Sequence, residues 1–195
     1  DVFQFIMLIL FVYILIPGTH NIENYMAAIA LVEGLATDDA IRQVARAFGG
    51  VEHRIELVRV KDGVRFYNDS IASSPSRTIA GLRSFPEQVI LIAGGYDKHI
   101  PYDVLGPEIC KHVKKLFLGG ATGPKIRAAV EAAPEYAPGK PEIVDCKDFT
   151  EATLAAAKAA ESGDVVLMSP ASAAFDQFKN FMVRGEYYKK LIKEL

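Results

Sequence analysis

The sequence is poor in cysteine and nearly balanced in charge, and each shortage excludes a class of protein. Its 195 residues include two cysteines, and neither Cys110 nor Cys146 lies in a C-x-x-C spacing or beside a group of histidines. No zinc site is therefore indicated, and of the two remaining states, a disulfide or free thiols, we expect buried free thiols. A formal net charge of -2 and a pI of about 6.1 argue against nucleic acid or a membrane surface as a partner, because both attract a basic face.

The sequence also lacks an apolar run long enough to cross a membrane. Residues 2–16 carry no charge, but a membrane-spanning helix needs about 20 apolar residues. No basic stretch precedes this run and no small-residue cleavage motif follows it, so a signal peptide is not indicated. Its content of valine, isoleucine, phenylalanine and tyrosine favours one or two buried strands, with a truncated chain end as the alternative. We expect a cytoplasmic protein.

Two helices and a domain boundary are predicted after this run. The first helix is expected to begin with Asn21 as its N-cap, and the second spans 37–48 with Thr37 as its cap. Gly49 and Gly50 end the second helix. We place the boundary there, which gives a helical segment over 1–50 and a larger domain over 51–195.

Beyond the boundary, short apolar runs alternate with helical patterns. The runs predict six strands, over 54–60, 64–67, 88–93, 115–118, 142–144 and 164–168. The remaining stretches predict five helices, over 76–84, 102–113, 124–133, 149–161 and 176–195. This alternation indicates an α/β fold with a Rossmann-like, doubly wound, mostly parallel sheet. The first two runs, joined by Lys61-Asp62-Gly63, predict one antiparallel edge.

Ligands of an open parallel sheet bind beyond the carboxyl ends of its strands, and the loops there are unusually polar or small. In the loop NDSIASSPSRT, Asn68, Asp69 and Ser70 can bond ribose hydroxyls or a metal-bound water, or only shape the turn and cap the next helix. In the loop GGYDKH, Lys98 can anchor a carboxylate or a phosphate. The alternative for Lys98 is a surface pair with Asp97.

A third loop, SPASAAFDQF, combines small side chains with aromatic ones. The small residues from Ser169 to Ala174 let a ligand approach backbone N–H groups at the start of the final helix. A helical spacing then predicts a core-facing stripe of Phe175, Phe178, Phe181 and Met182. Within it, Phe175 and Phe181 are placed to border a pocket.

The loop GGATGPK supports a rival hypothesis. Gly120 and Gly123 match two of the three glycines of a dinucleotide-binding fingerprint, and Asp145 follows at about the expected distance. However, Leu118 occupies the first glycine position and Pro124 follows the last. This hypothesis is a stand-alone Rossmann-like domain that binds a dinucleotide.

Polar residues on either side of the boundary complete the candidates. Asn21 and Asn24 are three residues apart, so they share one face of a helical turn. Their amides can read an adenine edge or cap the helix. Arg54 can stack on a base or contact a phosphate, while a lone histidine such as His53 is usually structural.

Five strings occur together in the order typical of one family. They are GTHNIEN (18–24), GGVEHRIE (49–56), NDSIASSP (68–75), GGYDKH (94–99) and SPASAAFDQFKNFMVRGEYY (169–188). With them the chain resembles the Mur ligases over about residues 17–195. The NDS string and the FDQFKNF segment resemble the branch that adds D-glutamate. The resemblance implies that residues 1–50 are the end of a central ATPase domain and that 51–195 are the C-terminal domain.

The same resemblance implies roles for individual residues. The nucleotide contacts are Asn21 and Asn24, against the adenine of ATP, together with His53, Arg54 and Asp69. The residues around an incoming D-glutamate are Ser73, Lys98, Phe181, Ala174 and Phe175.

Two departures from the family pattern affect this pocket. Ala174 and Phe175 stand where the family has a Ser-Leu pair, so Ser172 or backbone N–H groups have to replace the missing hydroxyl. Ile71 stands where many members carry lysine, which removes one cation from the pocket.

The implied reaction joins D-glutamate to UDP-N-acetylmuramoyl-L-alanine through an acyl phosphate, with ATP and Mg²⁺. Such chemistry needs positioning and charge neutralisation more than a reactive side chain, so we expect no catalytic residue in this chain. The chain has no G-x-x-x-x-G-K-S/T motif, the phosphate-binding loop that would hold ATP. We therefore expect ATP and Mg²⁺ to be bound mainly by the missing central domain. With the N-terminal UDP-binding domain missing as well, we expect this fragment to be inactive alone.

Overall fold

The computed structural model describes residue 16 and residues 18–195, and these form two compact units that divide after Val51. Apart from Ile16, the apolar run over residues 2–16 lies outside the described residues. No helix in the described part of the chain is long and apolar enough to span a membrane.

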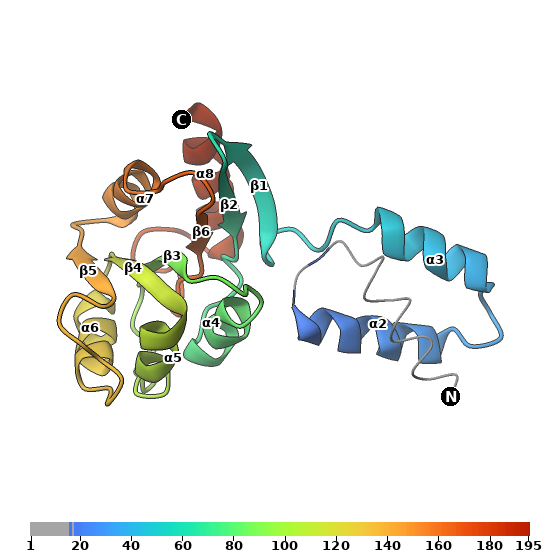
Figure 1. Cartoon of the computed structure of the whole chain (residues 1–195), viewed down its shortest axis with the longest axis horizontal. Helices are drawn as coiled ribbons and strands as arrows, with labels where there is room; N and C mark the ends of the chain where they lie inside the picture. The colour runs from blue at the N-terminus through green and yellow to red at the C-terminus, as the bar shows by residue number, and fades with distance from the viewer. Residues whose placement is uncertain (1–15, 17) are drawn as a thin grey trace. The chain divides into compact units, whose positions relative to one another are not determined.

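The first unit contains two helices, α2 (Thr19–Leu31) and α3 (Asp38–Ala47) (Figure 1). The N-cap of α2 is Gly18, so the prediction that Asn21 caps this helix is wrong, and Asn21 lies in its first turn. The predicted cap of α3 is confirmed, because the Thr37 hydroxyl oxygen accepts a hydrogen bond from the Ala40 N–H at 3.3 Å.

The second unit contains a six-stranded sheet in the order β1-β2-β6-β3-β4-β5 (Figure 1). The strands are β1 (Glu56–Lys61), β2 (Val64–Asn68), β3 (Val89–Ala93), β4 (Val113–Leu118), β5 (Glu142–Asp145) and β6 (Val165–Met168). The β1–β2 pair is antiparallel and the other pairs are parallel. The predicted α/β fold, with its mostly parallel sheet and one antiparallel edge, is confirmed.

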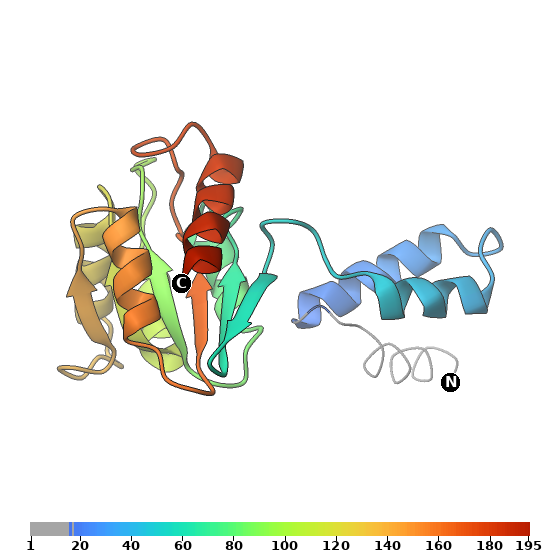
Figure 2. The same ribbon diagram turned by 90° about the horizontal axis from the view of Figure 1, so that it is seen from above.

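Helices cover both faces of this sheet. They are α4 (Pro75–Leu82), α5 (Leu105–His112), α6 (Gly123–Glu131), α7 (Phe149–Lys158) and α8 (Phe181–Glu194). One face carries α4, α5 and α6, and the other carries α7 and α8 (Figure 2). In β3, Leu91 packs into the first core while Ile90 and Ile92 pack into the second. Because β3 is covered on both faces, all five of its residues are buried.

The final helix begins later than predicted. Its N-cap is Asn180, whose side-chain oxygen accepts a hydrogen bond from the Val183 N–H at 2.9 Å. The predicted core stripe is therefore wrong at two positions, since Phe175 is 63% exposed and Met182 is 49% exposed. Phe178 packs against Phe149 from the loop before the helix, with ring centroids 5.2 Å apart.

Candidate functional site

The loops that leave β2, β3, β4 and β6 are hydrogen-bonded to one another at the carboxyl edge of the sheet. The β3 loop joins the β6 loop through the Tyr96 N–H, which donates to the Ala173 carbonyl at 2.9 Å. The β4 loop joins the β3 loop through the Thr122 N–H and the Gly95 carbonyl, 3.0 Å apart. The β2 loop joins the β6 loop through Asp69. The candidate loops thus form one continuous edge, as the parallel topology predicts.

Asp69 points into the protein. It is 3% exposed, and its carboxylate accepts hydrogen bonds from the Ser169 hydroxyl at 2.7 Å and from the Ile55 N–H at 3.3 Å. Burial raises the pKa of Asp69 to about 7, although these hydrogen bonds and the charges of Arg54 and Arg77 act in the opposite direction. Asp69 therefore ties the end of β2 to β6 and to the chain just before β1.

The hydrogen bond between Asp69 and Ile55 fixes the backbone conformation around Arg54. His53 has a φ of 64° and Ile55 a φ of 47°, which is a strained conformation for a β-branched residue. The hydrogen bond from Ile55 to Asp69 holds that conformation in place. Between the two residues, the Arg54 side chain is exposed and forms no ion pair or hydrogen bond with any described residue. Arg54 is thus a cation presented outward from a fixed backbone.

His53, in contrast, is engaged inside the domain. Its Nδ1 atom lies 3.0 Å from the Asn68 amide nitrogen, and its ring packs edge-on against Phe181 at 6.0 Å. Gly185 leaves room for the imidazole, because a Cβ there would lie 2.3 Å from the His53 Nδ1 atom. His53 is 5% exposed, so its environment is that of a structural histidine, as expected for a lone one.

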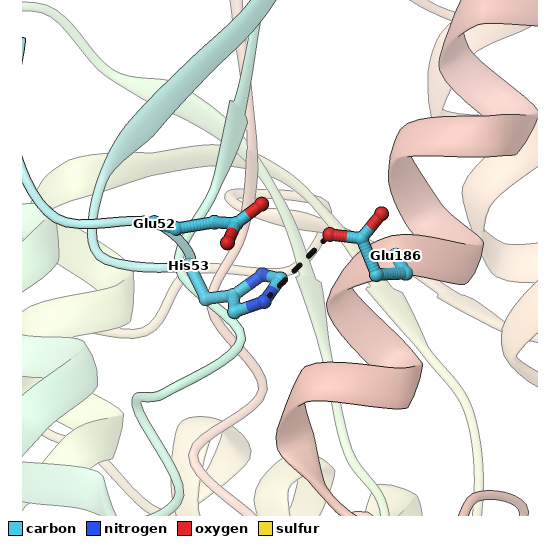
Figure 3. A group of neighbouring side chains, drawn as sticks. All are labelled: Glu52, His53 and Glu186. Atoms are coloured by element: carbon cyan, nitrogen blue, oxygen red, sulfur yellow. Dashed lines mark ion pairs between the residues drawn. The ribbon is translucent and has the colours of Figure 1, made fainter.

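Glu52, His53 and Glu186 bring three possible metal-ligand atoms together (Figure 3). The His53 Nε2 atom lies 3.8 Å from the Glu186 carboxylate. Lys189 already pairs with both carboxylates of this group, since its ammonium lies 2.5 Å from Glu52 and 3.1 Å from Glu186. It also lies 3.1 Å from the neighbouring Glu56. Its hydrogen bond lowers the pKa of Glu52. We interpret the group as an ion-pair cluster that fastens the start of the domain to α8.

Arg184 is the buried joint between two of the loops. It is 1% exposed and donates to the Ser70 hydroxyl at 3.0 Å and the Ser70 carbonyl at 2.9 Å. It also donates to the carbonyls of Ser172 and Ala173, both at 3.1 Å. Burial lowers the pKa of Arg184 to about 10. Sequence reasoning missed this residue, because a single arginine in a helical pattern gives no sign of being buried.

Ser172 also faces inward. Its hydroxyl lies 2.8 Å from the Tyr102 hydroxyl and 2.7 Å from the Thr122 hydroxyl, and the residue is fully buried. A ligand at the surface cannot use it, so Ser172 does not replace the hydroxyl missing at Ala174. Ala174 itself is 2% exposed.

Lys98 lies on the exposed part of the β3 loop. The alternative of an Asp97–Lys98 pair is wrong, because the Asp97 carboxylate pairs with Lys125 at 2.5 Å. The Lys98 ammonium has no partner among the described residues. Beside it in sequence, Tyr96 packs edge-on against Phe175 with ring centroids 5.9 Å apart. The loop therefore offers an unpaired cation next to an exposed aromatic pair.

Of the other predicted ligand residues, Phe181 and Ser73 lie at the β2 loop, and Asn21 and Asn24 lie on α2. The Phe181 carbonyl accepts a hydrogen bond from Ser70 at 2.7 Å, so Phe181 adjoins the β2 loop, and Ser73 is partly exposed in that loop. In the first unit, the Asn24 amide donates to Asn21 at 3.5 Å, so these two residues share a helix face as predicted.

A small hollow lies beside these loops, between β3 and the segment before α8. Asp176 and Arg184 provide its charged lining, and Phe149 and Phe178 provide apolar lining. None of the predicted ligand residues lines it, so we do not assign it as the ligand site.

The geometry does not favour the dinucleotide hypothesis. A Cβ at Gly120 would lie 2.9 Å from the Gly95 Cα atom. Glycine is therefore needed at this position because the β3 and β4 loops pass close to each other, and a dinucleotide is not required to explain it. The Asp145 carboxylate, which would have to bind a ribose, pairs with Arg127 at 2.7 Å.

The fold is shared with solved structures of low sequence identity. A folylpolyglutamate synthase from Mycobacterium tuberculosis, complexed with ADP and AMPPCP, matches with a TM-score of 0.60 and 16% identity over 90% of this chain and 41% of that chain. A pseudomurein peptide ligase type C from Methanothermus fervidus matches with a TM-score of 0.61 and 16% identity over 91% of this chain and 36% of that chain. At these identities the likeness concerns the fold alone.

Sequence comparison identifies the family. The model of the Mur ligase glutamate ligase domain matches residues 53–172, and the chain belongs to the Mur ligase family. A UDP-N-acetylmuramoylalanine–D-glutamate ligase from Acetivibrio thermocellus is 55% identical over 93% of this chain and 40% of its own length. One from Clostridium beijerinckii is 47% identical over the same shares. The chain thus spans about 40% of the length of these curated relatives.

Proposed function

We propose that this chain is the D-glutamate-binding part of an ATP-dependent ligase that joins D-glutamate to UDP-N-acetylmuramoyl-L-alanine. The observation that carries the proposal is the 55% identity, over 93% of the chain, with a ligase of that name. The reaction would serve peptidoglycan precursor synthesis in the cytoplasm, and through the cell wall it would affect cell shape and division.

In this proposal the β2, β3 and β6 loops bind D-glutamate. The unpaired ammonium of Lys98 and the hydroxyl of Ser73 hold its carboxylates, and the Phe181 side chain borders the amino acid. Ser172 is occupied inside the protein, so backbone N–H groups at Ala174 and Phe175 supply the remaining donors. The inward-facing Arg184 keeps the β2 and β6 loops in register.

Arg54 covers the nucleotide in the assembled enzyme, and Asn21 and Asn24 contact its adenine. Asp69 acts through the backbone that presents Arg54, since its carboxylate is committed to Ile55 and Ser169. When bound, ATP supplies the phosphoryl group that activates the alanyl carboxylate. Lys189 already neutralises the Glu52–His53–Glu186 group, so we assign Mg²⁺ to the part of the enzyme that this chain does not include.

These residues position the reactants. The D-glutamate amine attacks the activated carbonyl, an amide bond forms, and phosphate leaves. Lys98 and the backbone donors fix the amine within reach of the carbonyl, which lowers the entropic part of the barrier. Because no side chain of this chain forms a covalent bond, binding residues are expected to dominate its mutational sensitivity.

The test uses the full-length ligase that contains this chain. With ATP and UDP-N-acetylmuramoyl-L-alanine saturating, phosphate release is measured as D-glutamate is varied. Lys98→Ala is expected to lower kcat/KM for D-glutamate by about 100-fold or more, because a charged anchor is lost from a site that is closed during reaction. Lys111→Ala removes an exposed lysine from the last turn of α5 and serves as the matched control.

Two results would overturn the proposal. One is a wild-type enzyme whose phosphate release does not depend on D-glutamate. The other is a Lys98→Ala enzyme whose kinetics match those of Lys111→Ala. The isolated 195-residue chain is expected to hydrolyse no ATP.

A further inference from the structure

Arg77 lies on the same polar loop as Ser73. It belongs to the first turn of α4, and its Nη1 atom donates to the Ile71 carbonyl at 3.3 Å. That carbonyl also accepts the Ser73 N–H at 2.8 Å. The guanidinium group is therefore held against the backbone of the loop that offers Ser73 to a ligand.

The charges of Arg77 and Arg54 both act on the same buried carboxyl, that of Asp69. Burial raises the pKa of Asp69, and the positive charges of Arg54 and Arg77 both act against that rise. Asp69 does not pair with either arginine, because its oxygens accept hydrogen bonds from Ser169 and Ile55. Arg54 and Arg77 are both exposed, and neither has a carboxylate partner among the described residues.

Four other arginines, all partly or fully exposed, pair with acidic residues, whereas Arg59 donates to the carbonyls of Ile192 and Lys193. The four pairs are Arg42 with Asp39, Arg65 with Glu87, Arg83 with Glu108 and Arg127 with Asp145. Arg77 uses one N–H group on a carbonyl, and a guanidinium has five, so it can still grip an anion with two parallel hydrogen bonds. A cation in the first turn of a helix is also electrostatically unfavourable, and α4 has no acidic residue there to offset it. The fold gains little from this charge.

We propose that Arg77 is an anion-binding residue of the site, where it grips a carboxylate or phosphate oxygen of a substrate beside Ser73. The inference rests on the proposed function and deepens it. It gives the loop a cation even though Ile71 is apolar at a position where lysine is expected. The guanidinium reaches the Ile71 backbone from the first turn of α4, four residues beyond Ser73, and supplies the charge there.

The experiment is again done in the full-length ligase. The variants are Arg77→Ala, Arg77→Gln and the double variant Ile71→Lys/Arg77→Ala, with Arg83→Ala as control. Arg83 is the C-cap residue of the same helix and pairs with Glu108. Arg77→Gln keeps a donor near the Ile71 carbonyl but removes the charge. KM is measured for D-glutamate with ATP saturating, and for ATP with D-glutamate saturating.

Arg77→Ala and Arg77→Gln are both expected to raise one of the two KM values by about 10-fold or more, while Arg83→Ala leaves both unchanged. A rise for D-glutamate identifies the anion as its carboxylate, and a rise for ATP identifies a phosphate. Adding Ile71→Lys is expected to recover part of the loss. The inference is overturned if both KM values stay within twofold of the control.

The two proposals fail in different ways. If wild type ligates D-glutamate and Lys98→Ala is impaired while both Arg77 variants behave like Arg83→Ala, only the Arg77 inference fails. If wild type does not use D-glutamate, the proposed function fails and takes the Arg77 inference with it. If Arg77→Ala is impaired but Arg77→Gln is not, the hydrogen bond to Ile71 matters rather than the charge, and the inference is also overturned.

Discussion

The loops at the carboxyl edge of the sheet contain two kinds of polar residue, which differ in whether they find a partner inside the protein. The inner kind, such as Asp69, Ser172 and Arg184, is at most 3% exposed and is hydrogen-bonded between loops. The outer kind, represented by Arg54 and Lys98, is exposed and unpaired within the described chain. The inner residues fix the shape of the loops, and the outer cations remain available to an anion from outside.

The largest expected effect comes from removing the inner arginine. Arg184→Met is expected to lower the free energy of unfolding by about 3 kcal/mol or more, because the buried carbonyls of Ser70 and Ser172 lose their donor. The Ala173 carbonyl loses one of its two donors and keeps the Tyr96 N–H. Urea denaturation of the purified chain measures this change. The methionine keeps the length and apolar stem of the side chain, so the loss reports the polar joint rather than a cavity.

Arg83→Met is the matched change on the surface. Arg83 is exposed and paired with Glu108, and such pairs contribute about 1 kcal/mol or less. If Arg184→Met were no more destabilising than Arg83→Met, the loops would be held by something other than this joint. The distinction between inner and outer residues would then lose its energetic basis.

A second effect, which depends on pH, is expected at Asp69. Burial raises its pKa to about 7 in the folded protein, from an ordinary value of 3.8. Between these values the unfolded chain releases the proton while the folded chain keeps it, so a rise in pH favours unfolding. Relative to Asp69→Asn, the wild type should therefore lose stability as the pH rises from about 4 to about 7, by at most about 1.4 kcal/mol per pH unit. Above about 7 the difference should level off.

Urea midpoints of both proteins, measured from pH 4.5 to pH 8, give this difference directly. Asp62→Asn serves as control, since Asp62 is exposed in the turn between β1 and β2. Its curve should run parallel to that of the wild type. A wild-type curve that also runs parallel to Asp69→Asn would mean that the carboxyl titrates in the folded state as it does in the unfolded chain.

Most of the fold could be predicted from the sequence, because strands and helices depend on local patterns. Runs such as Val89–Ala93 are apolar and short, which predicts a buried strand before any neighbour is known. The start of the last helix was mispredicted because aromatic residues from Phe175 onward happen to recur at helical spacing. The Asn180 cap outweighed that spacing locally, since its side chain satisfies a backbone N–H of the helix.

The site was predictable only in part. Parallel topology places the loops after β2, β3 and β6 at one edge, so the region could be predicted. Whether a polar residue faces inward depends on contacts between loops far apart in sequence. Asp69 meets Ser169, and Arg184 meets Ser70, across separations of 100 residues or more. No local pattern distinguishes a buried residue such as Arg184 from exposed ones such as Arg54 and Lys98. The sequence alone therefore predicted neither the buried position of Arg184 nor the binding role that we propose for Arg77.

The smallest expected change in stability concerns the outer arginine of α4. Arg77→Ala should alter the free energy of unfolding by less than about 0.5 kcal/mol, and in the stabilising direction, because it removes a positive charge from a helix start. The measurement is the same urea titration used for Arg184→Met. A loss of about 1 kcal/mol or more would show that the hydrogen bond to Ile71 holds the loop, and Arg77 would then belong with the inner residues.

Measuring both stability and binding for variants of Arg184 and Arg77 distinguishes the inner residues from the outer ones. For Arg184→Met we expect a large loss of stability, with any kinetic defect following from displaced loops. For Arg77→Ala we expect unchanged or slightly higher stability together with a raised KM. A residue that weakens binding when removed, yet slightly destabilises the fold when present, is kept for its ligand rather than for its structure.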